Sequence, residues 1–240
     1  MISEQTTVVG IIGAMQSEVD LLAAMTEDKS EIRLGKHTFI TGTIDRTAVV
    51  IARAGIGKVN AAACAAAMIL RFHPAVILNT GVAGALDPAL SVGDLAIADA
   101  AVEYDLNYGV LGDPRGAVFY PDGTEEILLP TDRDVADALE AAAKKLGLSP
   151  LRGTVASGDR FVSDPAIKRD IRSAFGEDVR VCEMEGAAIV HVCRLYGVRC
   201  GILRSVSDSA DGNAEVDFPT FVQSSARVAA AVAECFIRSL

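Results

Sequence analysis

The stretch "VRVCEMEGAAIVHVCRLYGVRCGILRSVSD", residues 179–208, decides the fold class of this chain. Its apolar spacing predicts a strand, a helix ending at a glycine and a second strand, over 179–184, 185–197 and 199–208. Two carboxylates, Glu183 and Glu185, stand where the first strand passes into the helix. An acid at that point is either a surface group that favours a helix N-terminus or a group that binds a ligand.

The rest of the chain repeats this alternation of strands and helices. The remaining strands are expected over 7–15, 37–57 (a hairpin with its turn near Asp45), 75–79, 93–104 and 151–159, and helices over 17–25, 58–72, 132–147, 165–175 and 218–240. Glycines at 81–84 predict a loop after the third of these strands, and residues 105–130 predict a long surface loop. No linker or repeat divides the chain, so we expect a single three-layer α/β domain over 1–240, with 1–6 as a short flexible start.

Composition excludes several classes of function. The formal net charge is −10, which would repel DNA or RNA. The apolar runs are shorter than the roughly 20 residues that span a bilayer, and no basic segment precedes the first one. We therefore expect a cytoplasmic protein with neither a nucleic-acid nor a membrane partner.

Cysteines and histidines are few and scattered. The five cysteines are odd in number and have no CxxC spacing, so they are typical of small core residues in a reducing compartment. Three separate histidines offer almost no ligands for zinc, and we predict no metal site. The glycine segments "GIIGAM" and "NTGVAGAL" match neither GxGxxG nor a P-loop, so no cofactor is predicted.

Polar clusters follow several predicted strands, which is the most informative feature of the sequence. They lie at Gly13–Glu18, Gly81–Gly84, Ser157–Val162, Glu183–Glu185 and Ser207–Asp208. Ligands of open α/β sheets gather beyond the carboxyl ends of strands. Several such clusters together predict one shared pocket.

The motifs "GIIGAMQSEVDLL", "AGIGKVNAA", "NTGVAGAL", "ASGDRFV", "CEMEGAAIVHVC" and "RSVSDSAD" resemble the 5′-methylthioadenosine/S-adenosylhomocysteine nucleosidases. That family belongs to the nucleoside phosphorylase/hydrolase superfamily. The motifs occur in the family's order from residue 8 to about 221. The resemblance implies a central mixed twisted sheet flanked by helices, and hydrolysis of the N-glycosidic bond of an adenine nucleoside.

Such hydrolysis needs a protonated leaving base, held ribose hydroxyls and an activated water, and three carboxylates in different surroundings can supply these functions. The resemblance implies that Asp208, steadied by Ser207, protonates adenine N7. It implies that Glu18 is the base on the attacking water and that Glu185 accepts hydrogen bonds from the ribose hydroxyls. Glu183 is predicted to be the structural partner of a nearby cation.

The resemblance also implies a set of substrate contacts. Phe161 would stack on the purine, the Val162 backbone would read its Watson–Crick edge, and Met184 would pack beneath the sugar. Arg204 would help to position the water. The ribose and 5′ pocket would be lined by Met15, Ile56 and Phe218, with the glycine segment contributing Val82, Ala83 and Gly84.

Two departures from the family concern the water and the 5′ group. Val82 stands where the family usually has a serine, and the loop 104–123 lacks the family's usual histidine and aromatic pattern. In relatives this loop is contributed partly by a neighbouring subunit and closes over the 5′ substituent of the substrate, so a homodimer is expected. A phosphate-dependent nucleoside phosphorylase, a futalosine-type hydrolase and a nucleoside-binding protein without activity remain as alternatives.

Overall fold

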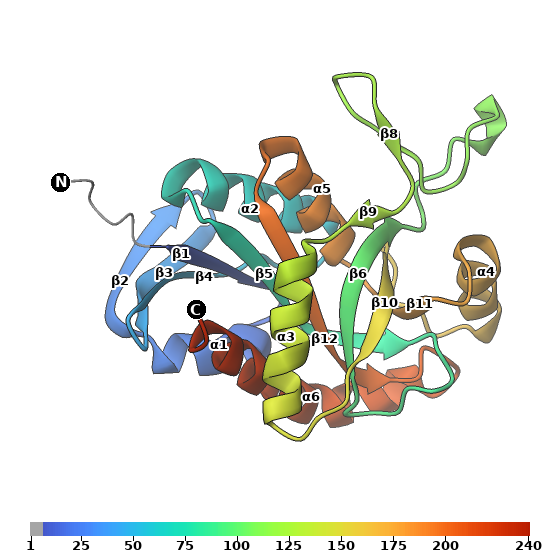
Figure 1. Ribbon diagram of the computed structural model, residues 1–240. Coiled ribbons are helices and arrows are strands. Elements are labelled where there is room, and N and C mark those ends of the chain that lie inside the picture. Colours follow the sequence, from blue (N-terminus) through green and yellow to red (C-terminus); the bar gives the residue numbers. More distant parts are fainter. Residues whose placement is uncertain (1–6) are drawn as a thin grey trace.

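A computed structural model describes residues 7–240 (Figure 1); the flexible start predicted for 1–6 lies outside the described residues. The strands are β1 Val8–Gly13, β2 Glu27–Leu34, β3 His37–Ile44, β4 Thr47–Arg53, β5 Val76–Ala85, β6 Leu95–Glu103, β7 Val118–Phe119, β8 Glu125–Glu126, β9 Leu129–Pro130, β10 Leu151–Ser157, β11 Val179–Glu183 and β12 Arg199–Asp208. The helices are α1 Gln16–Met25, α2 Lys58–Phe72, η1 (a 3-10 helix) Gly109–Leu111, α3 Arg133–Lys145, α4 Pro165–Phe175, α5 Gly186–Tyr196 and α6 Ala214–Ile237.

The main sheet is mixed and curls back on itself. Its strand order is β11-β10-β6-β12-β5-β1-β4-β3-β2, with β9 paired to β6. In addition, β11 pairs antiparallel with the end of β5, at Val181 opposite Ala85 and Cys182 opposite Gly84. The strands β5, β12, β6, β10 and β11 therefore form a closed ring, while β1 to β4 extend as an open sheet.

Helices cover both faces of this sheet, which confirms the three-layer α/β architecture (Figure 1). One apolar cluster joins the sheet to α2 and α5, through side chains such as Met68 and Ile189. A second cluster on the opposite face joins it to α1, α3 and α6, through Leu22, Leu139 and Phe236. Alanines make up two of the five buried residues of α2 and five of the nine buried residues of α6.

Two predicted loops contain strands. The glycine loop predicted at 81–84 is wrong, because β5 continues to Ala85 with β12 on one side and β11 on the other. These neighbouring strands supply hydrogen-bond partners for the backbone of this segment. Within the predicted loop 105–130, β7 and β8 form a small hairpin that projects from the body of the protein, and β9 joins the main sheet (Figure 1).

Two further elements differ from the sequence prediction. Strand β2 was not predicted, because its sequence "EDKSEIRL" is largely exposed and lacks a regular apolar alternation. The last helix begins at Ala214 rather than at 218, with Pro219 inside it. A proline favours a helix start, which explains the misplaced boundary. In the part of the chain described here, no helix combines the length and apolar character needed to cross a membrane.

Candidate active site

A cavity of about 360 Å³ lies beyond the carboxyl ends of β1, β5, β11 and β12. This volume is within the usual range for small-molecule sites. Glu18, Glu185 and Asp208 all line the cavity, although they are far apart in the chain. The other lining residues are Ala14, Met15, Ile56, Val82, Ala83, Gly84, Phe161, Cys182, Glu183, Met184, Ser207 and Phe218. The shared pocket predicted from the strand ends is therefore present.

Glu18 is held by backbone donors from two strand ends. It lies in the first turn of α1, and its Oε2 accepts hydrogen bonds from the backbone N–H groups of Ala14 (2.7 Å) and Met15 (2.8 Å). Its Oε1 accepts from the Val82 N–H at 3.0 Å. Burial raises the pKa of Glu18, against the opposing effect of the Arg204 charge and these N–H donors. The result is a fixed carboxylate that accepts a proton more readily than an exposed glutamate.

Asp208 ends β12 and is 2% exposed. Its Oδ2 accepts a hydrogen bond from the Ser207 hydroxyl at 2.9 Å, and its Oδ1 accepts from the Ala210 N–H at 2.9 Å. Burial raises the pKa of Asp208 despite these two donors. A carboxyl group that keeps its proton towards neutral pH can act as a general acid.

Glu185 stands between β11 and α5, and its carboxylate reaches across the cavity floor to the start of α2. Its Oε1 accepts a hydrogen bond from the Gly57 N–H at 2.8 Å. Burial and the neighbouring Glu183 carboxylate raise the pKa of Glu185 to about 8. Its other oxygen has no hydrogen-bond partner among residues 7–240, which leaves it able to accept hydrogen bonds from a ligand.

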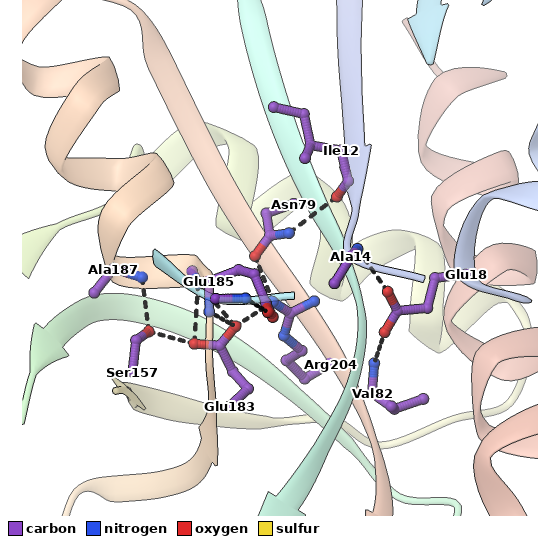
Figure 2. A network of polar contacts seen from close by, with 12 residues as sticks. Ile12, Ala14, Glu18, Asn79, Val82, Ser157, Glu183, Glu185, Ala187 and Arg204 are labelled. Carbon is purple, nitrogen blue, oxygen red and sulfur yellow. Dashed lines mark hydrogen bonds and ion pairs between the residues drawn. The ribbon is translucent and has the colours of Figure 1, made fainter. Parts of the chain in front are cut away.

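Glu183 has a different environment, shown in Figure 2. It forms an ion pair with the buried guanidinium of Arg204 and accepts hydrogen bonds from the Ser157 hydroxyl and from the N–H groups of Glu185 and Gly186. This confirms the prediction that Glu183 pairs with a cation. Although one side of Glu183 touches the cavity, its oxygens are committed to protein donors.

Asn79 completes this network from β5. Its Oδ1 accepts a hydrogen bond from Arg204 Nη2 at 2.6 Å, and its Nδ2 donates to the Ile12 carbonyl at 2.9 Å (Figure 2). Arg204 is 1% exposed and lies behind the cavity wall. Its positive charge still acts on Glu18 through the intervening Gly81, where an added Cβ would touch both side chains.

Most of the predicted contact residues line the main cavity, with two exceptions. Arg204 is one, and Val162 is the other. Val162 lines a small adjoining cavity of about 30 Å³ that shares Phe161 and Asp208 with the main one. Sequence reasoning missed the lining residue Cys182 and the supporting residue Asn79, and it gave no individual role to Ala14 and Ser157, which lie within the predicted strand-end clusters. A polar residue inside a buried strand, such as Asn79, was the available signal.

The wall opposite the acids is apolar. The rings of Phe161 and Phe218 meet edge to face, with centroids 5.5 Å apart. Ile56 is 56% exposed and Phe161 42% exposed, so both present apolar surface at the cavity mouth. Together with Met15 and Met184, they suit a flat apolar ring and a sugar better than a strongly charged ligand.

The electrostatic character of the cavity restricts the chemistry further. Among residues 7–240, neither a lysine nor an arginine lines it, whereas four carboxylates do. The described residues also contain no cluster of three or more His, Cys, Asp or Glu side chains arranged to hold a metal ion. The site can therefore exchange protons and accept hydrogen bonds from hydroxyl groups, but it offers no side-chain cation to an anionic ligand.

Known proteins resemble this chain along nearly its whole length. A family model described as the phosphorylase superfamily matches residues 8–240. The aminodeoxyfutalosine nucleosidase of Campylobacter jejuni is 38% identical over 92% of this chain and 94% of its own length. A 5′-methylthioadenosine/S-adenosylhomocysteine nucleosidase of Halalkalibacterium halodurans is 39% identical over 90% and 92%. The Neisseria meningitidis nucleosidase of that name, solved with methylthio-immucillin-A, superposes with a TM-score of 0.93 at 34% identity, covering 98% of this chain and 100% of that one.

Proposed function

The chain belongs to the phosphorylase superfamily, and we propose that it hydrolyses the N-glycosidic bond of 5′-methylthioadenosine, S-adenosylhomocysteine or a closely related adenine nucleoside. One observation carries this proposal. Three acids distant in sequence, Glu18, Glu185 and Asp208, line one cavity, and burial raises the pKa of each. The names of the similar proteins support the same reaction.

Asp208 is the general acid in this proposal. Cleavage leaves the bonding electrons on adenine, and protonation of N7 makes the base a better leaving group. Burial raises the pKa of the Asp208 carboxyl, which favours its protonated form, and the Ser207 hydroxyl and the Ala210 N–H fix its direction. Phe161, whose ring is supported edge to face by Phe218, would hold the purine plane beside it.

Glu18 and Glu185 act on the sugar. Glu185 accepts hydrogen bonds from the ribose hydroxyls with the oxygen that Gly57 does not occupy. Glu18 takes a proton from a water molecule as that water attacks C1′ on the face opposite adenine. Arg204 serves as a positioning residue, because its charge opposes the rise in the pKa of Glu18 and its ion pair fixes Glu183.

The lining favours water over phosphate as the nucleophile. A phosphate anion is usually bound by arginine or by other cationic groups. In the described chain, Glu18 and Val82 line the cavity wall and no basic side chain does. A carboxylate beside C1′ would repel phosphate, so the phosphorylase alternative is disfavoured.

Hydrolysis of aminodeoxyfutalosine is the second candidate, because a relative 38% identical carries that name. The loop 104–123 bears on this choice, since it is expected near the 5′ group of the nucleoside bound by a neighbouring subunit. The test is side-by-side incubation of 5′-methylthioadenosine, S-adenosylhomocysteine and aminodeoxyfutalosine in phosphate-free buffer, with chromatographic measurement of adenine. We expect adenine from at least one of them, and release from none would contradict the proposal.

A homodimer is part of the proposal. Apolar side chains are exposed on the 3-10 helix η1 and in the first turn of α2, including Val110 at 97%, Leu111 at 76% and Val59 at 79%. A second copy of the chain would cover them. In sedimentation experiments, Val110→Asp should weaken the dimer, whereas Leu146→Asp at the end of α3 should not.

Five unpaired cysteines support a cytoplasmic location.

A further inference from the structure

A second cavity adjoins the one described above and has the opposite charge. It shares the lining residues Ala14, Met15 and Ile56 with the main cavity, so the two cavities adjoin at these residues. Its remaining lining residues are Gln16, Lys36, His37, Arg53, Ala54, Gly55 and Asn60. No acidic side chain of the described chain lines it.

The topology brings the basic side chains to this place. Arg53 ends β4, which runs parallel to β1, and it lies opposite Gly13 at the end of β1. Lys36 comes from the turn between β2 and β3, and His37 is the first residue of β3. Because β3 is antiparallel to β4, this turn lies at the same edge of the sheet as the end of β4. The basic side chains therefore line a cavity that adjoins the main one at Met15.

Within residues 7–240, the charged groups of Lys36 and Arg53 have no acidic partner. By contrast, Lys58 and Arg152 are each paired with two or more acids. The formal net charge is −10, with 32 acidic and 22 basic residues, so acids are more numerous than cations. Unpaired cations lining a cavity are available to bind an anion.

We infer that Lys36 and Arg53, with His37, form a subsite for a carboxylate at the far end of the 5′ substituent of the nucleoside. This inference rests on the proposed function, because adenine and ribose must occupy the main cavity with C5′ directed towards Met15 and Ile56. A 5′ chain that passes these shared residues enters the basic cavity. S-adenosylhomocysteine has an amino acid carboxylate at this end, whereas 5′-methylthioadenosine has only a methyl group. The subsite would therefore favour nucleosides with a long, acid-terminated 5′ substituent.

The test uses two nucleosides that differ in charge alone. They are 5′-deoxyadenosine derivatives with a 3-carboxypropylthio group or with its carboxamide at C5′. We expect the full-length protein to have a higher kcat/KM for the carboxylate. The double variant Lys36→Gln/Arg53→Gln should lower the carboxylate-to-carboxamide ratio of kcat/KM by about fivefold to tenfold, as expected for two partly exposed ion pairs. Raising the salt concentration should lower this ratio for the wild-type protein.

Lys145→Gln is the matched control, because it removes one positive charge on the exposed end of α3. It should leave the ratio as in the wild type. An equal ratio in the wild-type protein and the double variant would overturn the subsite while leaving the proposed function intact. If neither nucleoside releases adenine, calorimetric dissociation constants for the same two compounds decide the subsite, while adenine release from 5′-methylthioadenosine decides the proposed function separately. Tighter binding of the carboxylate that the double variant loses supports the subsite, and equal binding rejects it.

Discussion

Glu183 and Glu185 are two residues apart and both are buried, yet their surroundings are opposite. Glu183 is neutralised by Arg204 and receives hydrogen bonds from Ser157 and from two backbone N–H groups. Glu185 receives one hydrogen bond, from Gly57, and faces the cavity. The comparison shows that burial alone does not make a carboxylate reactive. A buried acid whose oxygens are all committed supports the fold, and one with a free oxygen is available to a ligand.

The largest effect is expected from replacing Glu183, the acid whose oxygens are all bonded to protein groups. Glu183→Gln would leave the Arg204 guanidinium buried without its counter-charge, and should lower the free energy of unfolding by about 3–5 kcal/mol. Urea denaturation followed by circular dichroism measures this change. Glu185→Gln is the matched control, because the same substitution there removes no ion pair and should change stability by less than about 1 kcal/mol. Equal losses in both variants would contradict the distinction.

The next effect tests an acid that faces the cavity. Asp208→Asn keeps the shape of the side chain but removes the proton donor, so kcat should fall by at least about 100-fold. Binding of 5′-methylthioadenosine, measured by calorimetry, should be largely retained. Turnover at the wild-type rate would remove Asp208 from its proposed role as general acid.

A smaller loss is expected from moving Glu18 without changing it. A Cβ added at Gly81 would lie 2.4 Å from Glu18 Oε1 and 2.5 Å from Arg204 Nη1. Gly81→Ala should therefore displace the carboxylate and lower kcat by about tenfold to a hundredfold. Gly212→Ala is the control, since a Cβ there meets nothing within 4 Å. Wild-type kcat in Gly81→Ala would show that the position of Glu18 is not critical.

The smallest effect concerns stability and pH. Burial and the Glu183 charge raise the pKa of Glu185 to about 8, so the folded protein holds a proton that the unfolded chain loses above about pH 4.3. The free energy of unfolding should therefore fall as pH rises from about 5 to 8. We expect Glu185 to contribute to this fall, because a carboxyl group that binds its proton more tightly in the folded state loses that stabilisation as pH rises towards its folded pKa. Urea titrations at several pH values should show a flatter profile for Glu185→Gln, and parallel profiles would contradict the raised pKa.

The sequence predicted the part of the site that depends on local pattern. Asp208 and Glu185 follow recognisable strands, and strand ends of α/β sheets gather at one edge. What it did not predict depends on contacts between distant segments. The extension of β5 through Gly84 requires β11 and β12 as neighbours, and the role of Asn79 requires Arg204 from another strand. The basic cavity likewise depends on distant segments, because Lys36 and Arg53 come to the same cavity through the pairing of β3 with β4.

The central claim is that acids in this cavity make water the nucleophile that separates the sugar from adenine. The most direct measurement is to incubate the protein with 5′-methylthioadenosine in phosphate buffer and to identify the sugar product by mass spectrometry. The account predicts free methylthioribose, formed at the same rate when phosphate is left out. A methylthioribose 1-phosphate product, with no turnover in the absence of phosphate, would contradict it.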